Sequence, residues 1–369
     1  MAVSLTDYSS LNDHLIDEYL EDVRAIFESG QFAAGSSVQK FEEQMARFNN
    51  CKHAVGVKSG TDALVICLNA LGIGAGDEVL MPVLAPASLA LSVARLGGTP
   101  VFVDVRQDSF TMDPDQAIAS LSTAKTKAII VHHTFGLSAE IDRIMTVART
   151  YSVPVIEDVT AAAGGRFHGR RLGSFGNFSC YDFGPSAVLS SAGSAGAIVS
   201  NDDNFVEHFR RLRLQGAGAS GIEAIGYDAM MDAVQAAFMI RKLAEHDDNN
   251  LDRVANARMY SQLFEDSAVV GPPVRDDLSH IYSEYVIQVS DPQALVDHLK
   301  EKEIEAAIPS IRPLHLEPAF AYLNYQQGAF PVAEEAAQRL VSIPVTPGLK
   351  KSQVNEVASA ILAFYGVPA

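Results

Sequence analysis

Hydrophobic and polar positions follow two periodicities along this chain. Apolar residues recur at helical spacing at 10–30, 38–48 and 62–71, and the last of these segments is apolar nearly all round, which predicts a buried helix. Short apolar runs at 79–81, 99–104, 128–132, 153–157 and 197–200 predict strands, and helical segments at 86–96, 114–120 and 141–151 connect them. Strands joined by helices indicate an α/β fold with a mainly parallel sheet that is buried on both faces.

The second half of the chain is more helical. Helices are predicted at 205–214 and 233–251, followed by a strand near 284–289 and helices at 292–302, 331–339 and 351–364. This change divides the chain into an N-terminal helical segment packing with the small domain (1–34), a large domain (35–248) and a small C-terminal α/β domain (249–369). The segment 216–221 is the best candidate for a mobile loop. Charge clusters at 202–203 and 245–248 are interpreted as solvated helix ends.

Composition excludes several classes of protein. There are 28 Lys and Arg against 45 Asp and Glu, so the net charge of −17 disfavours a nucleic-acid partner. Prolines and serines interrupt the longest apolar stretches, so we expect no membrane-spanning helix. The N-terminus lacks the basic and apolar regions of a signal peptide, and the three cysteines form no CxxC pair. We therefore expect a cytoplasmic protein with no disulfides.

Seven segments carry a family resemblance, and their order is more specific than any one of them. They are GVKSGTDAL (56–64), GAGDEV (74–79), PVFVDV (100–105), ED (157–158), GRRLGSFG (169–176), QAA (235–237) and PLH (313–315). From about residue 32 to 361, the chain resembles the DegT/StrS-type sugar aminotransferases, which are pyridoxal-phosphate (PLP) enzymes of fold type I. The resemblance implies a large domain with a mainly parallel seven-stranded sheet. It also implies a homodimer whose two subunits share each pocket.

The chain departs from this family at the residue that holds the cofactor. Family members bind PLP through a Schiff-base lysine in a segment similar to YDFGPSAVL (181–189), and here the lysine position is Ala187. A methyl group cannot form an imine or carry a proton. The sequence has no lysine between Lys127 and Lys242 to replace it.

The resemblance places further substitutions around the cofactor. Asp182 stands for the serine that binds the phosphate, and Asp228 stands for an asparagine that reaches the phosphate from the partner subunit. Two like charges at about 4 Å repel by roughly 4 kcal/mol at an effective dielectric of about 20. Pro86 replaces the ring-stacking residue and Ala161 replaces a glutamine beside the ring. From these changes we expect that the protein carries no PLP.

A polar pocket is still expected where the parallel strands end. The candidate catalytic residues are Asp182, Asp158 and His133, because clustered carboxylates raise one another's pKa and an imidazole can relay protons. The candidate substrate-binding residues are Ser59, Thr61, Pro86, His132, Thr160, Asp228 and His315. Ser59 and Thr61 have a structural alternative as helix caps, and the histidines have one as packing residues. No compact metal-ligand motif is present, so no metal is expected.

The sequence leaves three functions open. The first is an enzyme that has abandoned PLP and applies acid–base chemistry (cyclisation, dehydration, isomerisation or condensation) to a small biosynthetic intermediate, which the resemblance associates with secondary metabolism. The second is a non-catalytic partner of an active aminotransferase paralogue. The third is a sugar aminotransferase-like or dehydratase-like enzyme that binds PLP or pyridoxamine phosphate (PMP) without a covalent bond. The two aspartates favour the first, because a scaffold has no reason to acquire both.

Overall fold

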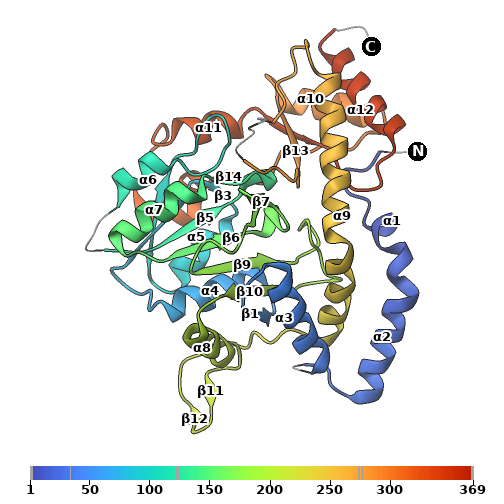
Figure 1. Ribbon diagram of the computed structural model, residues 1–369. Helices are drawn as coiled ribbons and strands as arrows, with labels where there is room; N and C mark the ends of the chain where they lie inside the picture. The colour runs from blue at the N-terminus through green and yellow to red at the C-terminus, as the bar shows by residue number, and fades with distance from the viewer. Residues whose placement is uncertain (1–2, 34, 122–124, 273–274, 276–277, 367–369) are drawn as a thin grey trace.

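A seven-stranded sheet forms the centre of the computed structural model, which describes residues 3–33, 35–121, 125–272, 275 and 278–366 (Figure 1). The strand order is β1-β10-β9-β6-β5-β2-β4; β10 is antiparallel to both neighbours and the other pairs are parallel. The strands are β1 (His53–Val57), β2 (Glu78–Pro82), β4 (Thr99–Val103), β5 (Thr126–His132), β6 (Val155–Asp158), β9 (Phe178–Asp182) and β10 (Gly196–Ser200). The predicted mainly parallel sheet is confirmed.

Helices cover both faces of this sheet, and each face has its own apolar core. In β6, Val155 belongs to one core and Ile156 to the other, which explains why the strand reads as a continuous apolar run. One face is covered by α4 (Gly60–Ala70), α5 (Ala87–Arg95) and α8 (Asp203–Arg213). The other is covered by α3 (Ser36–Phe48), α6 (Pro114–Ser120), α7 (Ile141–Tyr151) and α9 (Ala233–Leu263).

The long helix α9 also supports a second, smaller unit (Figure 1). There, β13 (Tyr285–Gln288) pairs antiparallel with β15 (Leu340–Ile343), and α10 (Pro292–Glu301) and α12 (Lys351–Phe364) pack on them. Tyr260, near the C-terminal end of α9, belongs to this apolar core. The boundary predicted at residue 248 therefore falls inside one continuous helix.

The N-terminal segment contacts both units. Val3 pairs with Ile304 beside the small sheet. The predicted single helix at 10–30 is instead divided into α1 (Tyr8–Asn12), a 3₁₀ turn η1 (Asp13–Leu15) and α2 (Ile16–Ser29). Helix α2 packs along the first half of α9, where Ile26 contacts the apolar cluster of Ala233 and Ala237. This N-terminal segment therefore packs on both units rather than on the small domain alone.

Short elements complete the fold. The segment expected to be a mobile loop instead forms a hairpin of β11 (Ala217–Gly218) and β12 (Gly221–Ile222), which protrudes from the large unit (Figure 1). The other short elements are β3 (Leu84–Ala85), β7 (Arg166–Phe167), β8 (Arg170–Arg171), β14 (Arg312–Pro313), α11 (Pro331–Ala337), η2 (Thr134–Gly136), η3 (Thr160–Ala162), η4 (Leu314–Leu316) and η5 (Pro318–Leu323). Across the described ranges, no helix has the length and apolar character needed to cross a bilayer.

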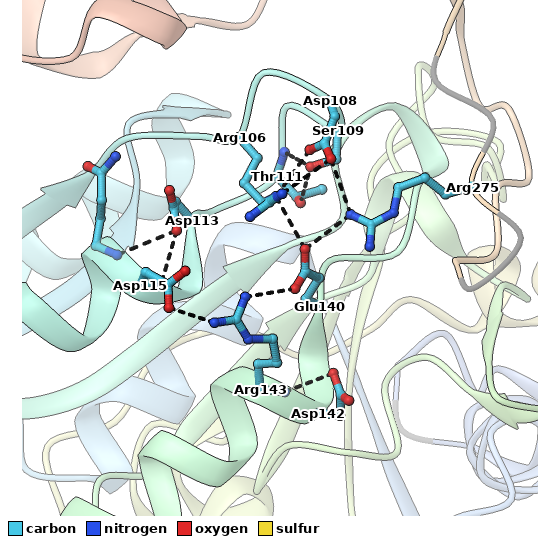
Figure 2. A network of polar contacts seen from close by, with 11 residues as sticks. Arg106, Asp108, Ser109, Thr111, Asp113, Asp115, Glu140, Asp142, Arg143 and Arg275 are labelled. Carbon is cyan, nitrogen blue, oxygen red and sulfur yellow. Dashed lines mark hydrogen bonds and ion pairs between the residues drawn. The ribbon is translucent and has the colours of Figure 1, made fainter.

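A cluster of arginines and carboxylates fastens the start of α7 to neighbouring segments (Figure 2). Glu140, just before α7, is its centre. One of its carboxylate oxygens lies 3.2 Å from Arg106 Nε and 3.1 Å from Arg275 Nη1, and the other lies 3.1 Å from Arg143 Nη1. Asp108 adds a second carboxylate beside Arg106 and Arg275. The largely buried carboxylate of Glu140 thus forms ion pairs with three arginines from different parts of the chain.

Replacing Glu140 by alanine should lower the free energy of unfolding by about 1–2 kcal/mol, because three guanidinium groups lose a shared partner. The effect stays below that of a fully buried pair, since the three arginine side chains remain 23% to 41% exposed. Urea unfolding followed by circular dichroism measures it. The matched control is Glu335→Ala, which removes one exposed helix pair with Arg339 and should change stability by only a few tenths of a kcal/mol. Equal effects of the two changes would contradict this role for Glu140.

Candidate functional site

A cavity of about 270 Å³ lies at the carboxyl ends of β5, β6 and β9. This is the edge at which parallel sheets of this kind bind ligands. Of the residues singled out in the sequence, the structure brings seven together in its wall: Pro86, His132, Asp158, Thr160, Ala161, Asp182 and Ala187. These residues come from segments that are far apart in the chain. They lie close together because β5, β6 and β9 all end at this edge of the sheet.

Asp158, the last residue of β6, is held in a fixed orientation by its neighbours. One carboxylate oxygen lies 2.8 Å from His132 Nδ1, and the other accepts hydrogen bonds from the hydroxyl and backbone N–H of Thr160 at 2.7 and 3.2 Å. Burial acts to raise the pKa of Asp158, but the hydrogen bonds from His132 and Thr160 outweigh it and the pKa lies below its usual value. The cavity therefore contains an ionised, immobile carboxylate.

The N-terminus of α4 forms another part of the wall. Ser59 caps this helix, because its hydroxyl accepts the backbone N–H of Asp62 at 3.1 Å. Of the two residues considered as helix caps, Ser59 is therefore the one that caps α4. Ser59 and Thr61 do not line the cavity, whereas Gly60 between them does. The backbone N–H groups and dipole of a helix N-terminus favour an anion here.

Asp182, the last residue of β9, lies directly against this helix terminus. A Cβ atom on Gly60 would collide with the Cβ of Asp182, so only glycine permits the approach. The carboxylate accepts the backbone N–H of Gly184 at 2.8 Å. Burial raises the pKa of Asp182, as does the negative charge of Asp158, while hydrogen bonds from Gly184 and Gly60 act in the opposite direction.

Ala187 lies half-buried in the cavity wall, in the turn that follows β9. Among the described residues that form this wall, none is a lysine or arginine. Glu284 also lines this wall and was not anticipated from the sequence, because it precedes β13 in the small unit and no motif marks it. Burial raises the pKa of Glu284 above its usual value, partly offset by a hydrogen bond with Ser342.

His133, expected to be a catalytic partner, lies outside this wall. Its Nδ1 accepts the backbone N–H of Ala139 at 3.0 Å, so the proton is on Nε2, which lies 3.4 Å from Glu157. Both ring nitrogens are therefore engaged in fully buried contacts. It was the neighbouring His132, from the end of β5, that reached the cavity, because successive strand residues point to opposite faces.

Two other predicted residues also lie away from the cavity. His315 is buried against Glu334, with Nε2 and Oε1 3.0 Å apart. Asp228 is exposed and pairs with Leu214 through a backbone bridge near the protruding hairpin. Its expected approach to Asp182 involves the other subunit of a dimer and stays a prediction.

Glu157 has a structural role that sequence reasoning missed. This fully buried carboxylate accepts the backbone N–H groups of Gly173, Phe175 and Gly176 at 2.9, 2.7 and 2.6 Å. It therefore fixes the GRRLGSFG segment to the end of β6, next to Asp158. The two residues of the ED pair therefore have different roles: Glu157 holds the 169–176 loop in place, and Asp158 lines the cavity.

The expected absence of a metal stays a prediction. Within the part of the chain that the structure describes, no group of three or more His, Cys, Asp or Glu residues is placed to hold an ion. The carboxylates of the cavity have separate hydrogen-bond donors: His132 and Thr160 bind Asp158, and the backbone N–H of Gly184 binds Asp182.

A mainly parallel seven-stranded sheet with a ligand cavity at its strand ends, joined to a small α/β unit by one long helix, defines the aminotransferases of fold type I. The chain belongs to the DegT/DnrJ/EryC1/StrS aminotransferase family, whose model matches residues 13–362. Members of this family are PLP-dependent enzymes, so enzymatic function is supported for the fold and family together.

Relatives cover nearly the whole chain. A pleiotropic regulatory protein of Geobacillus stearothermophilus is 35% identical, over 99% of both chains. The dTDP-3-amino-3,6-dideoxy-alpha-D-galactopyranose transaminase of Aneurinibacillus thermoaerophilus is 31% identical, over 97% of this chain and 98% of its own. The crystal structure of DesV from S. venezuelae, in complex with a ketimine intermediate, superposes with a TM-score of 0.95 at 30% identity, over 98% of both chains.

These relatives correct two expectations. The interpretation as an enzyme working without PLP is wrong, because proteins about 30% identical over nearly the full chain are named as sugar transaminases and one was crystallised with a ketimine intermediate. The expectation of no cofactor is wrong for the same reason. Its error was to treat the missing lysine at position 187 and four substitutions around the ring and phosphate as decisive, although the fixed carboxylate of Asp158 remained.

Proposed function

We propose that the protein is a sugar aminotransferase-like enzyme that binds PLP or PMP in the main cavity without a covalent bond. The observation that carries the proposal is the buried Asp158, ionised and fixed by His132 and Thr160 at the end of β6. A carboxylate of this kind suits the protonated nitrogen of a pyridine ring. The family membership supplies the reaction class.

The residues present fit a cofactor that is held by contacts alone. Asp158 would hold the ring nitrogen, and the N-terminus of α4 at Gly60 would receive the phosphate. Pro86 offers an apolar surface to the ring. Ala187 provides no amine, so the covalent attachment made by family lysines has no counterpart among the described residues of the wall.

Each side chain then has a specific task. When bound, the cofactor acts as an electron sink and exchanges an amino group with the substrate. His132 keeps Asp158 oriented, which would place a negative charge beside the ring nitrogen of a bound cofactor. Burial raises the pKa of Glu284, which favours its protonated form in the same cavity, and that form can donate a proton to a ligand oxygen or nitrogen.

The substrate class follows from the relatives by analogy. Their names refer to amino sugars linked to dTDP or UDP. We therefore propose a nucleotide-linked keto sugar as the substrate of this chain, in a cytoplasmic biosynthetic pathway. A homodimer is part of the proposal: the hairpin region exposes Ile222 and Ile225 at 74% and 90%, which suits an apolar contact with a second copy.

Replacing Asp158 by asparagine should weaken the binding of PMP by about tenfold or more, because the ring nitrogen loses a charged partner. Calorimetric titration with PMP measures the affinity, and the absorbance of the pyridine ring gives an independent signal. The control is Asp142→Asn, an exposed carboxylate at the start of α7. Failure of the unmodified protein to bind either PLP or PMP saturably would refute the proposed function.

A further inference from the structure

A second cavity, which we call the annex, lies beside the main one. Its volume is about 190 Å³, and five residues line both cavities: Ser186, Ala187, Val188, Ser283 and Glu284. The rest of its wall comes from α9, the N-terminal segment and the end of β15. The turn with Ala187 therefore separates two adjoining spaces.

Arg253 of α9 is the notable charge in the annex wall. Its side chain is buried, and its hydrogen bonds go to two neutral oxygens, Asn250 Oδ1 at 3.0 Å and the backbone oxygen of Val188 at 3.3 Å. Among the described residues, no carboxylate lies within ion-pair distance of it. Burial lowers the pKa of Arg253 to about 10, against a smaller opposing effect of Asp252, so the group stays charged near neutral pH. An uncompensated buried cation is costly unless an anion meets it.

A second cation lines the same space. Lys242, about three turns of α9 before Arg253, is also buried, and its Nζ lies 3.0 Å from Glu245. Glu245 in turn lies 2.6 Å from His14 Nε2. His246 adds no positive charge, because burial lowers its pKa to about 3. Two cationic side chains therefore line the annex: Lys242, which is paired with Glu245, and Arg253, which has no ion-pair partner among the described residues.

Glu284 is the acidic group in the annex wall, and an ionised carboxylate here would repel an anionic ligand. Its pKa is raised by burial, so the carboxyl group is driven toward the neutral form, which can donate a hydrogen bond. Ser283, next to it, has a buried hydroxyl without a hydrogen-bond partner among the described residues. A ligand oxygen placed between the two cavities would satisfy it.

We propose that the annex binds the carboxylate of a small organic acid, with Arg253 as its principal ionic partner and Lys242 as the second. The annex, at about 190 Å³, is smaller than the main cavity at about 270 Å³, so an amino acid-sized anion suits it better than a nucleotide. The assignment rests on the proposed function in one respect: an amino-group donor must reach the cofactor, and the annex adjoins the main cavity at Ala187. The annex would then hold the acid end of that donor.

Calorimetric titration with glutarate and with L-glutamate tests the site without any cofactor present. We expect saturable binding of both acids and none of glutaramide, the uncharged diamide of the same length. Lys242→Gln and Arg253→Gln should each weaken glutarate binding by about tenfold or more, because each removes a charge-assisted contact. Arg253→Lys, which keeps the charge but loses the planar donor fork, should give an intermediate loss and guards against misfolding of the glutamine variant.

The matched control is Arg258→Gln, which makes the same charge change at an exposed position of α9 outside the annex wall. It should leave glutarate binding unchanged. Absence of saturable binding by the unmodified protein, or unchanged affinity in the Lys242 and Arg253 variants, would overturn the annex proposal. PMP titration of the same variants separates the two proposals: binding of glutarate but not of PMP would support the annex and refute the proposed function.

Discussion

Replacing Ala187 by lysine is expected to give a protein that holds PLP covalently. Ala187 lines both cavities and is half-buried, so a longer side chain has space to extend into the main one. Its backbone N–H already closes a turn with Gly184 at 2.9 Å, and a lysine does not disturb that bond. Since an amine is the missing group, its return should change cofactor attachment from none to a large fraction of the molecules.

Borohydride reduction followed by peptide mass spectrometry measures this attachment. Before reduction, the variant should show the absorbance of a protonated imine. After reduction, we expect one cofactor adduct on the peptide that contains position 187. The control is Ser194→Lys, which adds an amine in the same loop at an exposed position outside both cavity walls. Equal labelling of the two variants would mean that the ring does not lie beside residue 187, and the proposed binding mode would fail.

Replacing Asp182 by serine should tighten PLP binding by about a hundredfold. The carboxylate of Asp182 lies against the N-terminus of α4, where the cofactor phosphate is proposed to bind. Two such charges at about 4 Å repel by roughly 4 kcal/mol at an effective dielectric of about 20, and partial exposure reduces this to about 2–3 kcal/mol. Serine also contributes a neutral hydrogen-bond donor.

The pH dependence of the affinity distinguishes charge from shape. The pKa of Asp182 is raised, so the carboxylate becomes neutral at a higher pH than an ordinary aspartate does, and the repulsion disappears as the pH falls through that pKa. The advantage of the serine variant should therefore shrink toward acidic pH. Asp182→Asn, which removes the charge at nearly constant shape, should reproduce most of the gain. If asparagine gives no gain, electrostatic repulsion is not the cause.

Part of the site was predictable because strand ends are easy to recognise. Asp158 ends a predicted apolar run, and parallel topology brings such ends together. Asp182 and Ala187 were located by the family resemblance instead, because the strand β9 before them was not predicted. The orientation of neighbouring residues was harder. His132 and His133 are adjacent in the sequence, and the side of the strand on which each lies decides that the first holds Asp158 while the second packs against Glu157. That choice depends on strand register, which the sequence pattern leaves open here.

Segments with mixed burial were the least predictable. The charge cluster at 245–248 was interpreted as a solvated helix end, yet it lies in the middle of α9. There, His246 is buried with Nε2 2.9 Å from the backbone oxygen of Ala163, and Asp247 pairs with Arg171. Polar residues that bond across to another element look the same in the sequence as residues that face water. The strands β1 and β9 were missed because no single strong apolar run marks their limits.

Helix α9 gives the molecule a mechanical property. Its 31 residues run without a break from the core beside α3 to the core containing Tyr260, so one rigid rod is shared by both units. A rod without a proline or glycine offers no hinge along its length. Severing the chain at 248 would leave each half with an apolar stripe facing water. The two units should therefore melt in a single cooperative step, and neither should be obtainable as a separate stable fragment.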